Sequence, residues 1–376
     1  MTASRPSAAA ALDGRTYGID LLRGVACLAV VAFHYLSRGP RAGFMPVSAL
    51  PSLEPFARYG YLGVHLFFMV SGYVIFLSAS GQSPRAFVAS RAARLYPALW
   101  IAATVTMACV VIRHDARFLV SWSEYLWNLT LIPQFVGARF VDGAYWSLAV
   151  EFQFYLLVWI MLRTGLLAKA ESGLWLWLGV AVIDGLRPTY LLERWLIANW
   201  APLFIFGAAT YLVASRGRTW SRVALMSVAL GAAVWHSRIE VVRLGQIWSG
   251  EGPDARIAGA IIVASAVPFV LYGVGTLRMN RSALAIVSGR LTYPVYLIHQ
   301  VCGYLLYGIL VQQNVAPVVA LVVTTGAALL SAWMINVAVE RPLGPRLRRA
   351  LAGAHARRAS GGETISPLPS RRSDGV

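Results

Sequence analysis

The chain has 376 residues, of which 58% are hydrophobic and only 13% are charged. Soluble domains usually contain about 45–50% apolar and about 25% charged residues, so this composition nearly excludes a water-soluble fold. A formal charge of +17 would suggest nucleic acid as the partner of a soluble protein. In a multispanning protein, basic residues first report which loops face the cytoplasm, so we expect no nucleic-acid partner.

Long apolar stretches recur along the whole chain. A bilayer span uses roughly 20 mostly apolar residues, and the sequence offers about ten such stretches. They lie near residues 19–36, 61–79, 95–112, 145–162, 173–186, 195–214, 221–236, 257–277, 291–310 and 316–339. The three cysteines fall inside these stretches, with no spacing typical of disulfides or a metal site. We predict an all-α, polytopic membrane protein with about ten transmembrane helices.

The basic residues predict the orientation of these spans. One set of alternate connections, including both termini, holds 21 Lys and Arg residues, whereas the other set holds 11. Because positive loops stay in the cytoplasm, both termini are predicted to be cytoplasmic in a multi-pass protein of the cell (inner or plasma) membrane. We expect a disordered N-terminus over 1–14, a membrane domain over 15–344 and a disordered tail over 345–376, whose arginines can contact membrane lipids.

The first stretch carries three ionisable side chains: Asp20, Arg23 and His34. Each costs at least roughly 2.5–3.5 kcal/mol in a bilayer, which makes it a functional candidate. At about 100° per residue, Arg23 and His34 share one helix face, separated by a rise of about 16 Å. A structural interpretation is also open, in which Arg23 pairs with Asp20 and His34 ends the helix at the interface. Together the three residues favour a polar pathway through the membrane.

The next candidates are Ser71 in the second stretch and the pair Arg91 and Arg94 in SRAARLYPALW. Two arginines three positions apart lie on one face of a helix and form an anion site suited to phosphates. Alternatively, Arg91 and Arg94 are flanking charges that only set the orientation of the neighbouring spans. Ser71 can equally serve in helix packing.

Further polar residues lie in the later stretches. Glu151 follows the start of YWSLAVEFQFYLL, and Tyr296 and His299 lie in LTYPVYLIHQ. A carboxylate at this depth needs a partner, for which a histidine or arginine of another span is suited. Hydrogen-bonded structural roles remain open for all three residues.

The order of these segments carries a family resemblance. The chain resembles the acyltransferase-3 family of integral membrane O-acyltransferases from about residue 18 to 344, through segments that occur in the family's order. They are IDLLRGVACLAVVAFHY, GVHLFFMVSGYVIF, RAARLYPALW, YWSLAVEFQFYLL, LTYPVYLIHQ and VERPLG. The resemblance implies an essential role for His34, a place for Arg23 in the same motif, and an association of Arg91 and Arg94 with the acyl donor.

The resemblance also implies an enzyme, an O-acetyltransferase of a cell-surface or exported carbohydrate, a lipid-linked glycan or a glycosylated metabolite. Acetyl-CoA, or another acyl-CoA, would be the co-substrate, and no bound cofactor or metal is expected. In our hypothesis His34 is the general base, Arg23 lies along the path of the donor, and Glu151 orients or charge-balances His34. Ser71, or Tyr296 with His299, would stabilise the oxyanion or line the acceptor path.

Three alternatives stay open at this point. His34 or Ser71 could carry the acyl group covalently between the two sides. A proton-coupled transporter or channel would use the same intramembrane polar residues, although it does not account for Arg91 and Arg94 or for the order of the segments. An inactive scaffold is the third alternative.

Overall fold

The computed structural model describes residues 8–248 and 252–353 of the chain. Every regular element in these ranges is helical. Nine helices in the described ranges are long and apolar enough to cross a membrane, and one bent helix pair brings the number up to 10. The nine are Tyr17–Arg41, Pro51–Ala79, Pro84–Arg113, Tyr145–Arg163, Leu166–Leu186, Tyr190–Arg216, Trp220–Gln246, Ala255–Gly273 and Pro317–Ala352. The predicted all-α, polytopic class is confirmed.

The helices that begin and end the described chain reach into the predicted terminal segments. Helix α1 (Ala8–Ala32) starts within the expected N-terminal segment, and α16 (Arg341–Gly353) covers the first part of the expected tail. Residues 1–7 and 354–376 lie outside the described ranges. The orientation of the bundle in the membrane stays a prediction from the basic residues.

Helices α4 (Gly63–Ala79) and α10 (Ala201–Arg216) form the centre of the bundle. The span of α4 is 78% buried and that of α10 is 72% buried. Their backbones touch because each helix contributes a glycine at the crossing. A Cβ added to Gly207 would lie 1.9 Å from the carbonyl oxygen of Met69, and one added to Gly72 would lie 2.1 Å from that of Phe204. Small residues allow this close approach. Close packing matters in a membrane because the hydrophobic effect contributes little to the association of helices in lipid.

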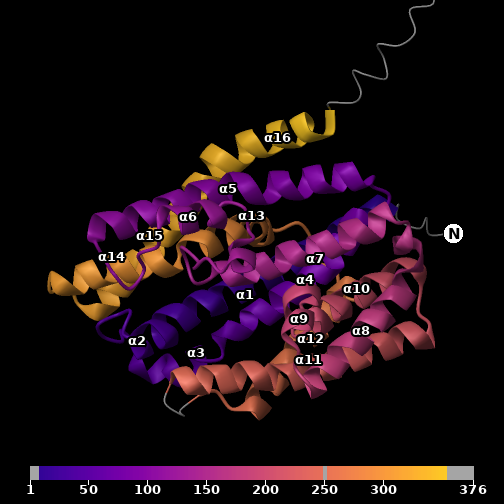
Figure 1. Ribbon diagram of the computed structural model, residues 1–376, viewed down its shortest axis with the longest axis horizontal. Coiled ribbons are helices and arrows are strands. Elements are labelled where there is room, and N and C mark those ends of the chain that lie inside the picture. Colours follow the sequence, from indigo (N-terminus) through magenta and orange to yellow (C-terminus); the bar gives the residue numbers. More distant parts are fainter. Residues whose placement is uncertain (1–7, 249–251, 354–376) are drawn as a thin grey trace, which may run out of the picture.

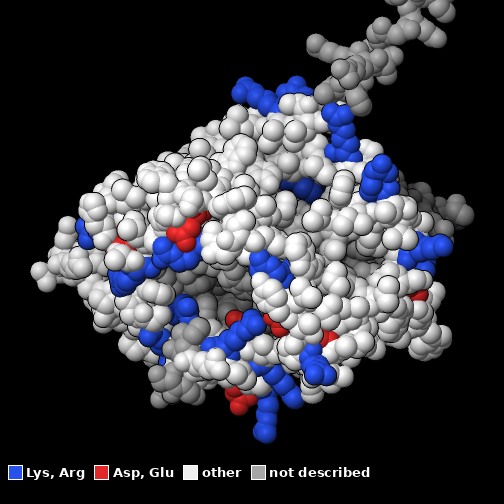
Figure 2. All heavy atoms as spheres, viewed as in Figure 1, with Lys and Arg blue, Asp and Glu red and all other residues white. Residues whose placement is uncertain are grey.

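The peripheral helices instead turn apolar surface outward. These are α8 (Ala170–Leu186), α11 (Trp220–Ile247), α12 (Ala255–Gly273) and α15 (Pro317–Ile335). Only 22% to 28% of their spans is buried inside the protein. Figure 2 shows a face that is mostly neither acidic nor basic, with charged side chains confined to separate small groups. Such a surface fits contact with lipid.

Helices α1 and α7 (Tyr145–Arg163) also contact α4. Helix α1 packs in addition against α13 (Ala283–Ile298), and α7 packs against α5 (Pro84–Arg113). Helix α5 runs beside α16 along one edge of the molecule (Figure 1).

Short helices lie at the ends of the long helices and in the connections between them. They are α2 (Gly39–Arg41), η2 (Pro51–Leu53), α3 (Glu54–Ala57), η3 (Gly60–Leu62), α6 (Trp122–Asn128), η4 (Pro133–Val136), η5 (Leu166–Lys169) and α9 (Tyr190–Leu196).

Two of the central helices are interrupted at a histidine. Helix α1 continues as a π-helical segment, η1 (Phe33–Arg38), in which His34 is the second residue. The predicted ninth span consists of α13 and α14 (Gln300–Gln312), which meet at His299 with a bend of 67°. A second π-helical segment, η6 (Asn336–Glu340), joins α15 to α16. Isolated π-helical turns occur frequently at functional sites.

The glycine crossing predicts that Gly207→Ala will destabilise the protein. The added methyl group meets the backbone of α4, so the two central helices must separate, at a cost of roughly 1–3 kcal/mol. The thermal midpoint of the purified protein in detergent should fall. Gly231→Ala is the matched control, because Gly231 is helical and a Cβ there meets nothing within 4 Å. Equal midpoints for the two variants would contradict the role of the crossing.

Candidate functional site

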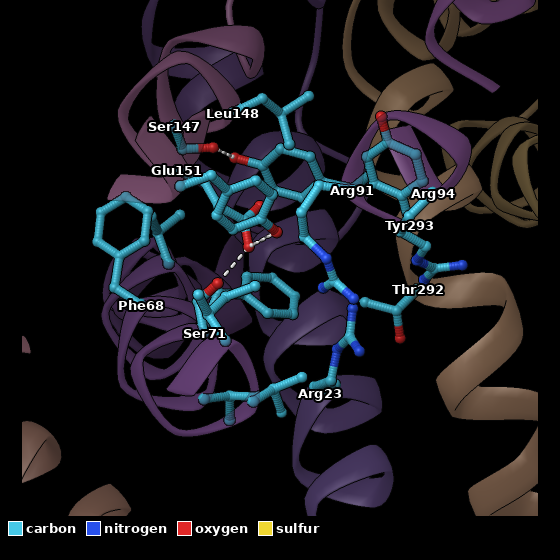
Figure 3. A pocket seen from close by; sticks show the side chains of 17 residues that line it. Arg23, Phe68, Ser71, Arg91, Arg94, Ser147, Leu148, Glu151, Thr292 and Tyr293 are labelled. Atoms are coloured by element: carbon cyan, nitrogen blue, oxygen red, sulfur yellow. Dashed lines mark hydrogen bonds between the residues drawn. The ribbon is translucent and has the colours of Figure 1, made fainter. Parts of the chain in front are cut away.

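An arginine-lined cavity of about 90 Å³ lies among α1, α4, α5, α7 and α13. Six of the eight candidate residues from the sequence lie on its wall: Arg23, Ser71, Arg91, Arg94, Glu151 and Tyr296. Figure 3 shows Arg23 and Arg91 extending toward the same region from different helices, with Ser71 and Glu151 beside them. We call this the arginine cavity.

The three guanidinium groups differ in how far they are neutralised. Arg94 lies 3.3 Å from Glu340 of η6, and Arg23 is only loosely paired with Asp20, at 3.9 Å. Arg91 donates to the Ser78 hydroxyl at 3.1 Å, and among the described residues it forms no ion pair. The cavity therefore presents donors to an anion, with Arg91 as the least compensated charge.

Opposite the arginines, Glu151 accepts hydrogen bonds from two hydroxyl groups. Ser71 donates to Oε1 of Glu151, and Tyr155 donates to the same oxygen at 2.8 Å. The sequence hypothesis placed Glu151 against His34, but no hydrogen bond joins these two side chains within the described residues. Its partners lie in the arginine cavity, where the positive charges compensate the carboxylate.

A second cavity of about 180 Å³, which we call the histidine cavity, is lined by His34. Aromatic side chains form much of its wall, including Trp146 and Trp200, whose ring centroids are 4.9 Å apart. Glu240 supplies a carboxylate to the same wall. Four other lining residues each have a buried polar atom that finds no hydrogen-bond partner among residues 8–248 and 252–353. These atoms are Nη1 of Arg38, the hydroxyl oxygen of Tyr61, Nδ1 of His65 and Oε1 of Gln300.

Unpartnered donors and acceptors beside aromatic rings are a combination typical of a site for a small polar ligand. Buried polar groups without partners are costly, and a ligand with hydroxyl groups would satisfy them.

The imidazole of His34 contacts that of His299. Nε2 of His299 lies 3.0 Å from Nδ1 of His34. His299 is fully buried, and its Nδ1 lies 3.0 Å from the carbonyl oxygen of Tyr296 and 3.1 Å from that of Val295. Carbonyl oxygens only accept, so Nδ1 of His299 carries the proton and, in the neutral ring, Nε2 is the acceptor.

The same argument fixes the tautomer of His34. Its Nδ1 faces two acceptors, Nε2 of His299 and the carbonyl oxygen of Val30 at 3.0 Å. Nδ1 of His34 must therefore carry a proton, which leaves a free lone pair on Nε2. A neutral imidazole with its lone pair available beside a cavity is suited to accept a proton.

Tyr296 and Val64 line both cavities. The Tyr296 hydroxyl is held by Ser147 at 2.6 Å and by the carbonyl oxygen of Ala144 at 3.2 Å. Phe67 packs edge-on against its ring. These contacts place a thin wall between the arginine cavity and the histidine cavity.

Two residues near the two histidines, Arg38 and Asp142, were not predicted from the sequence. Arg38 follows His34 by four positions, so helical spacing alone would have placed it on the same face. Asp142 lies in the connection before α7, where the sequence has no helical pattern that would single it out, yet its side chain is fully buried beside the interruption at His299.

No group of three His, Cys, Asp or Glu side chains suited to a metal occurs in the described part of the chain.

Comparisons with known proteins agree with the family resemblance. Residues 16–337 match the model of the acyltransferase-3 family, described as an acyltransferase domain. The exopolysaccharide production protein ExoZ of Rhizobium meliloti (strain 1021) is 25% identical over 80% of this chain and 95% of its own length. A putative membrane-bound transacylase, BcsY of Komagataeibacter xylinus, is 28% identical over 39% of this chain and 37% of its own length. No solved structure matches the chain.

Proposed function

Because this chain belongs to the acyltransferase-3 family and is a multi-pass membrane O-acyltransferase, we propose that it transfers acetyl from acetyl-CoA to a carbohydrate hydroxyl, with His34 as the general base. One observation carries the proposal. A cavity lined by arginines and a cavity lined by a neutral histidine adjoin each other across the wall of Tyr296 and Val64. The two cavities suit the two substrates of a transfer reaction.

The arginine cavity is the proposed donor site. CoA is strongly anionic, and guanidinium groups bind phosphate through paired donors. Arg91 and Arg94 lie in the first half of α5, near the end of the bundle that the basic residues predict to be cytoplasmic. The phosphates would bind there, while the pantetheine arm passes Arg23 and brings the thioester to the wall at Tyr296.

The histidine cavity is the proposed acceptor site. A sugar ring has apolar C–H faces and a polar rim, which complement the rings of Trp146 and Trp200 and the unpartnered atoms of Arg38 and Gln300. Its volume of about 180 Å³ suits one sugar unit at a time. The similarity to a protein named for exopolysaccharide production supports a polysaccharide or lipid-linked glycan as the acceptor.

The proposed reaction needs one proton transfer in each direction. Nε2 of His34 removes the proton of the acceptor hydroxyl as its oxygen attacks the thioester carbonyl carbon. The C–S bond breaks, and the imidazolium returns the proton to the CoA thiolate, which leaves as the thiol. No net proton is released. His299 stabilises the protonated form by accepting from Nδ1 of His34, the place that a carboxylate takes in a serine–histidine–aspartate triad.

A covalent relay through Ser71 is the second candidate path, because Ser71 donates to the carboxylate of Glu151 inside the proposed donor cavity. An acyl-Ser71 intermediate would form there without acceptor. Acetyl transfer to protein in the absence of acceptor, abolished by Ser71→Ala, would favour the relay. Direct transfer predicts no labelled protein.

We predict that His34→Gln will lower kcat by at least about 100-fold, because general-base catalysis contributes roughly 10²–10⁴-fold. Turnover is measured as radiolabelled acetate transferred to alkali-deacetylated surface polysaccharide of the producing cells. The wild-type rate should fall on acidification, because a protonated imidazole has no lone pair, and the residual rate of the variant should lose this dependence. His114→Gln, an exposed histidine at the end of α5, is the control. Normal turnover by His34→Gln would refute the base assignment.

Replacing both Arg91 and Arg94 by alanine should weaken acetyl-CoA binding by at least about tenfold. Each charge-assisted hydrogen bond contributes roughly 1.5–3 kcal/mol when its partner loses water. Calorimetric titration of the purified protein with CoA measures the effect, with Arg113→Ala at the opposite end of α5 as the control. Unchanged affinity in the double variant would remove the donor site from this cavity. An absence of CoA binding in the wild type would instead favour the transporter alternative.

Arg38→Met should raise the apparent KM for the polysaccharide by roughly tenfold, because a charge-assisted hydrogen bond to a sugar hydroxyl is lost. Acetyl-CoA affinity should stay unchanged, since Arg38 does not line the arginine cavity. Arg256→Met, an exposed arginine at the same end of the bundle, is the matched control. A parallel rise in the KM for acetyl-CoA would show that the two cavities are not separate substrate sites.

A further inference from the structure

The helix interruption at His299 leaves backbone groups that the regular helix would have paired. Unpaired backbone N–H and C=O groups at such a helix end need protein partners, because lipid chains form no hydrogen bonds. Here side chains from other segments bind them. Tyr145 donates to the freed carbonyl oxygen of Leu297 at 3.0 Å. Tyr35 donates at 2.6 Å to the carbonyl oxygen of His299, which also accepts from the backbone N–H of Gly303.

The start of α14 is bound by a carboxylate. Oδ2 of Asp142 accepts from the backbone N–H of Val301 at 2.9 Å, and Oδ1 accepts from that of Ala144 at 2.8 Å. Asp142 therefore joins the beginning of α7 to the second residue of α14. Both of its partners are donors, so a carboxylate satisfies both, whereas an amide would turn its own N–H toward one of them.

The neighbours of Asp142 in the chain fit closely against the same interruption. A Cβ added to Gly143 would lie 2.8 Å from Nε2 of Gln300, so the connection packs directly against the side chain of the first residue of α14. The carbonyl oxygen of Ala144 accepts from the hydroxyl of Tyr296 at 3.2 Å. Residues 142–145 thus contact the interruption on both sides of His299.

We propose that Asp142 is a positioning residue for the transfer reaction: it holds the start of α14 so that His299 meets His34 and fixes its reactive tautomer. This inference rests on the proposed base role of His34. Asp142 touches neither cavity, because it is absent from both walls. Its effect on the reaction passes through His299, whose ring position depends on where α13 ends and α14 begins.

The test is a double-mutant cycle between Asp142→Asn and His299→Ala, assayed with acetyl-CoA and the deacetylated surface polysaccharide. Asp142→Asn alone should lower kcat by roughly 10–100-fold, because a displacement of about 1 Å in a catalytic group costs about that much. The affinity for CoA should stay within about twofold of wild type. In the His299→Ala background, the same substitution should have little further effect, since the residue through which Asp142 acts is gone.

Asp254→Asn is the matched control. Asp254 also binds the first backbone N–H groups of a helix, those of Arg256 and Ile257, but that helix is α12, which is not part of the interruption at His299. A general loss of helix capping would affect both aspartate variants alike, in thermal midpoint and in CoA affinity. A purely structural role would also leave the pH–rate profile unchanged, whereas we expect Asp142→Asn to alter its acid limb.

Additive losses in the cycle, or full activity of Asp142→Asn, would overturn the inference. If Asp142→Asn does not fold, Asp142→Glu replaces it in the same cycle, because it keeps the charge and both acceptor oxygens while displacing α14 by one methylene group. Failure of the proposed function is seen separately. In that case His34→Gln itself would be active, whereas an inactive His34→Gln with an active Asp142→Asn would reject only the positioning role.

Discussion

A hydrocarbon layer contains no hydrogen-bond partners, so a helix that is interrupted within it depends on protein groups to bind its exposed backbone. This constraint governs the centre of the protein. Its two facing histidines lie at the two interruptions, one in the π-helical segment η1 and one between α13 and α14. One tyrosine hydroxyl and one aspartate bind the freed groups at the second interruption, and a second tyrosine binds the carbonyl oxygen of His299. The irregular backbone and the polar residues around it therefore form one structural unit.

The distribution of charge follows from the same constraint. The arginines of the arginine cavity come from α1 and α5 and are compensated to different degrees by carboxylates, so positive charge stays available for an anion. The histidines instead contact each other and backbone carbonyl oxygens. In the proposed reaction, binding of a charged donor and removal of a proton would thus take place in separate environments, each suited to its own step.

The sequence predicted the parts of this arrangement that depend on composition and helical spacing. Apolar stretches gave the all-α class and the spans, because a bilayer demands about 20 apolar residues for each. Helical spacing placed Arg91 and Arg94 on one face, and both line one cavity. Contacts between helices that are distant in the chain could not be predicted from composition or spacing. We expected Glu151 to contact His34, but it binds Ser71 and Tyr155. The contact of His34 with His299 depends on a bend in the helix that the apolar pattern of the sequence does not indicate.

The thin wall between the cavities has a consequence for the cell's energy balance. A protein with water-accessible polar cavities on both sides of its centre risks carrying protons down their gradient and discharging the membrane. Here the two cavities stay apart across Val64 and the ring of Tyr296, which Ser147 and Ala144 hold in place. The barrier is about one side chain thick at this point. The same ring that separates the two cavities therefore also keeps them from joining into one continuous polar path across the membrane.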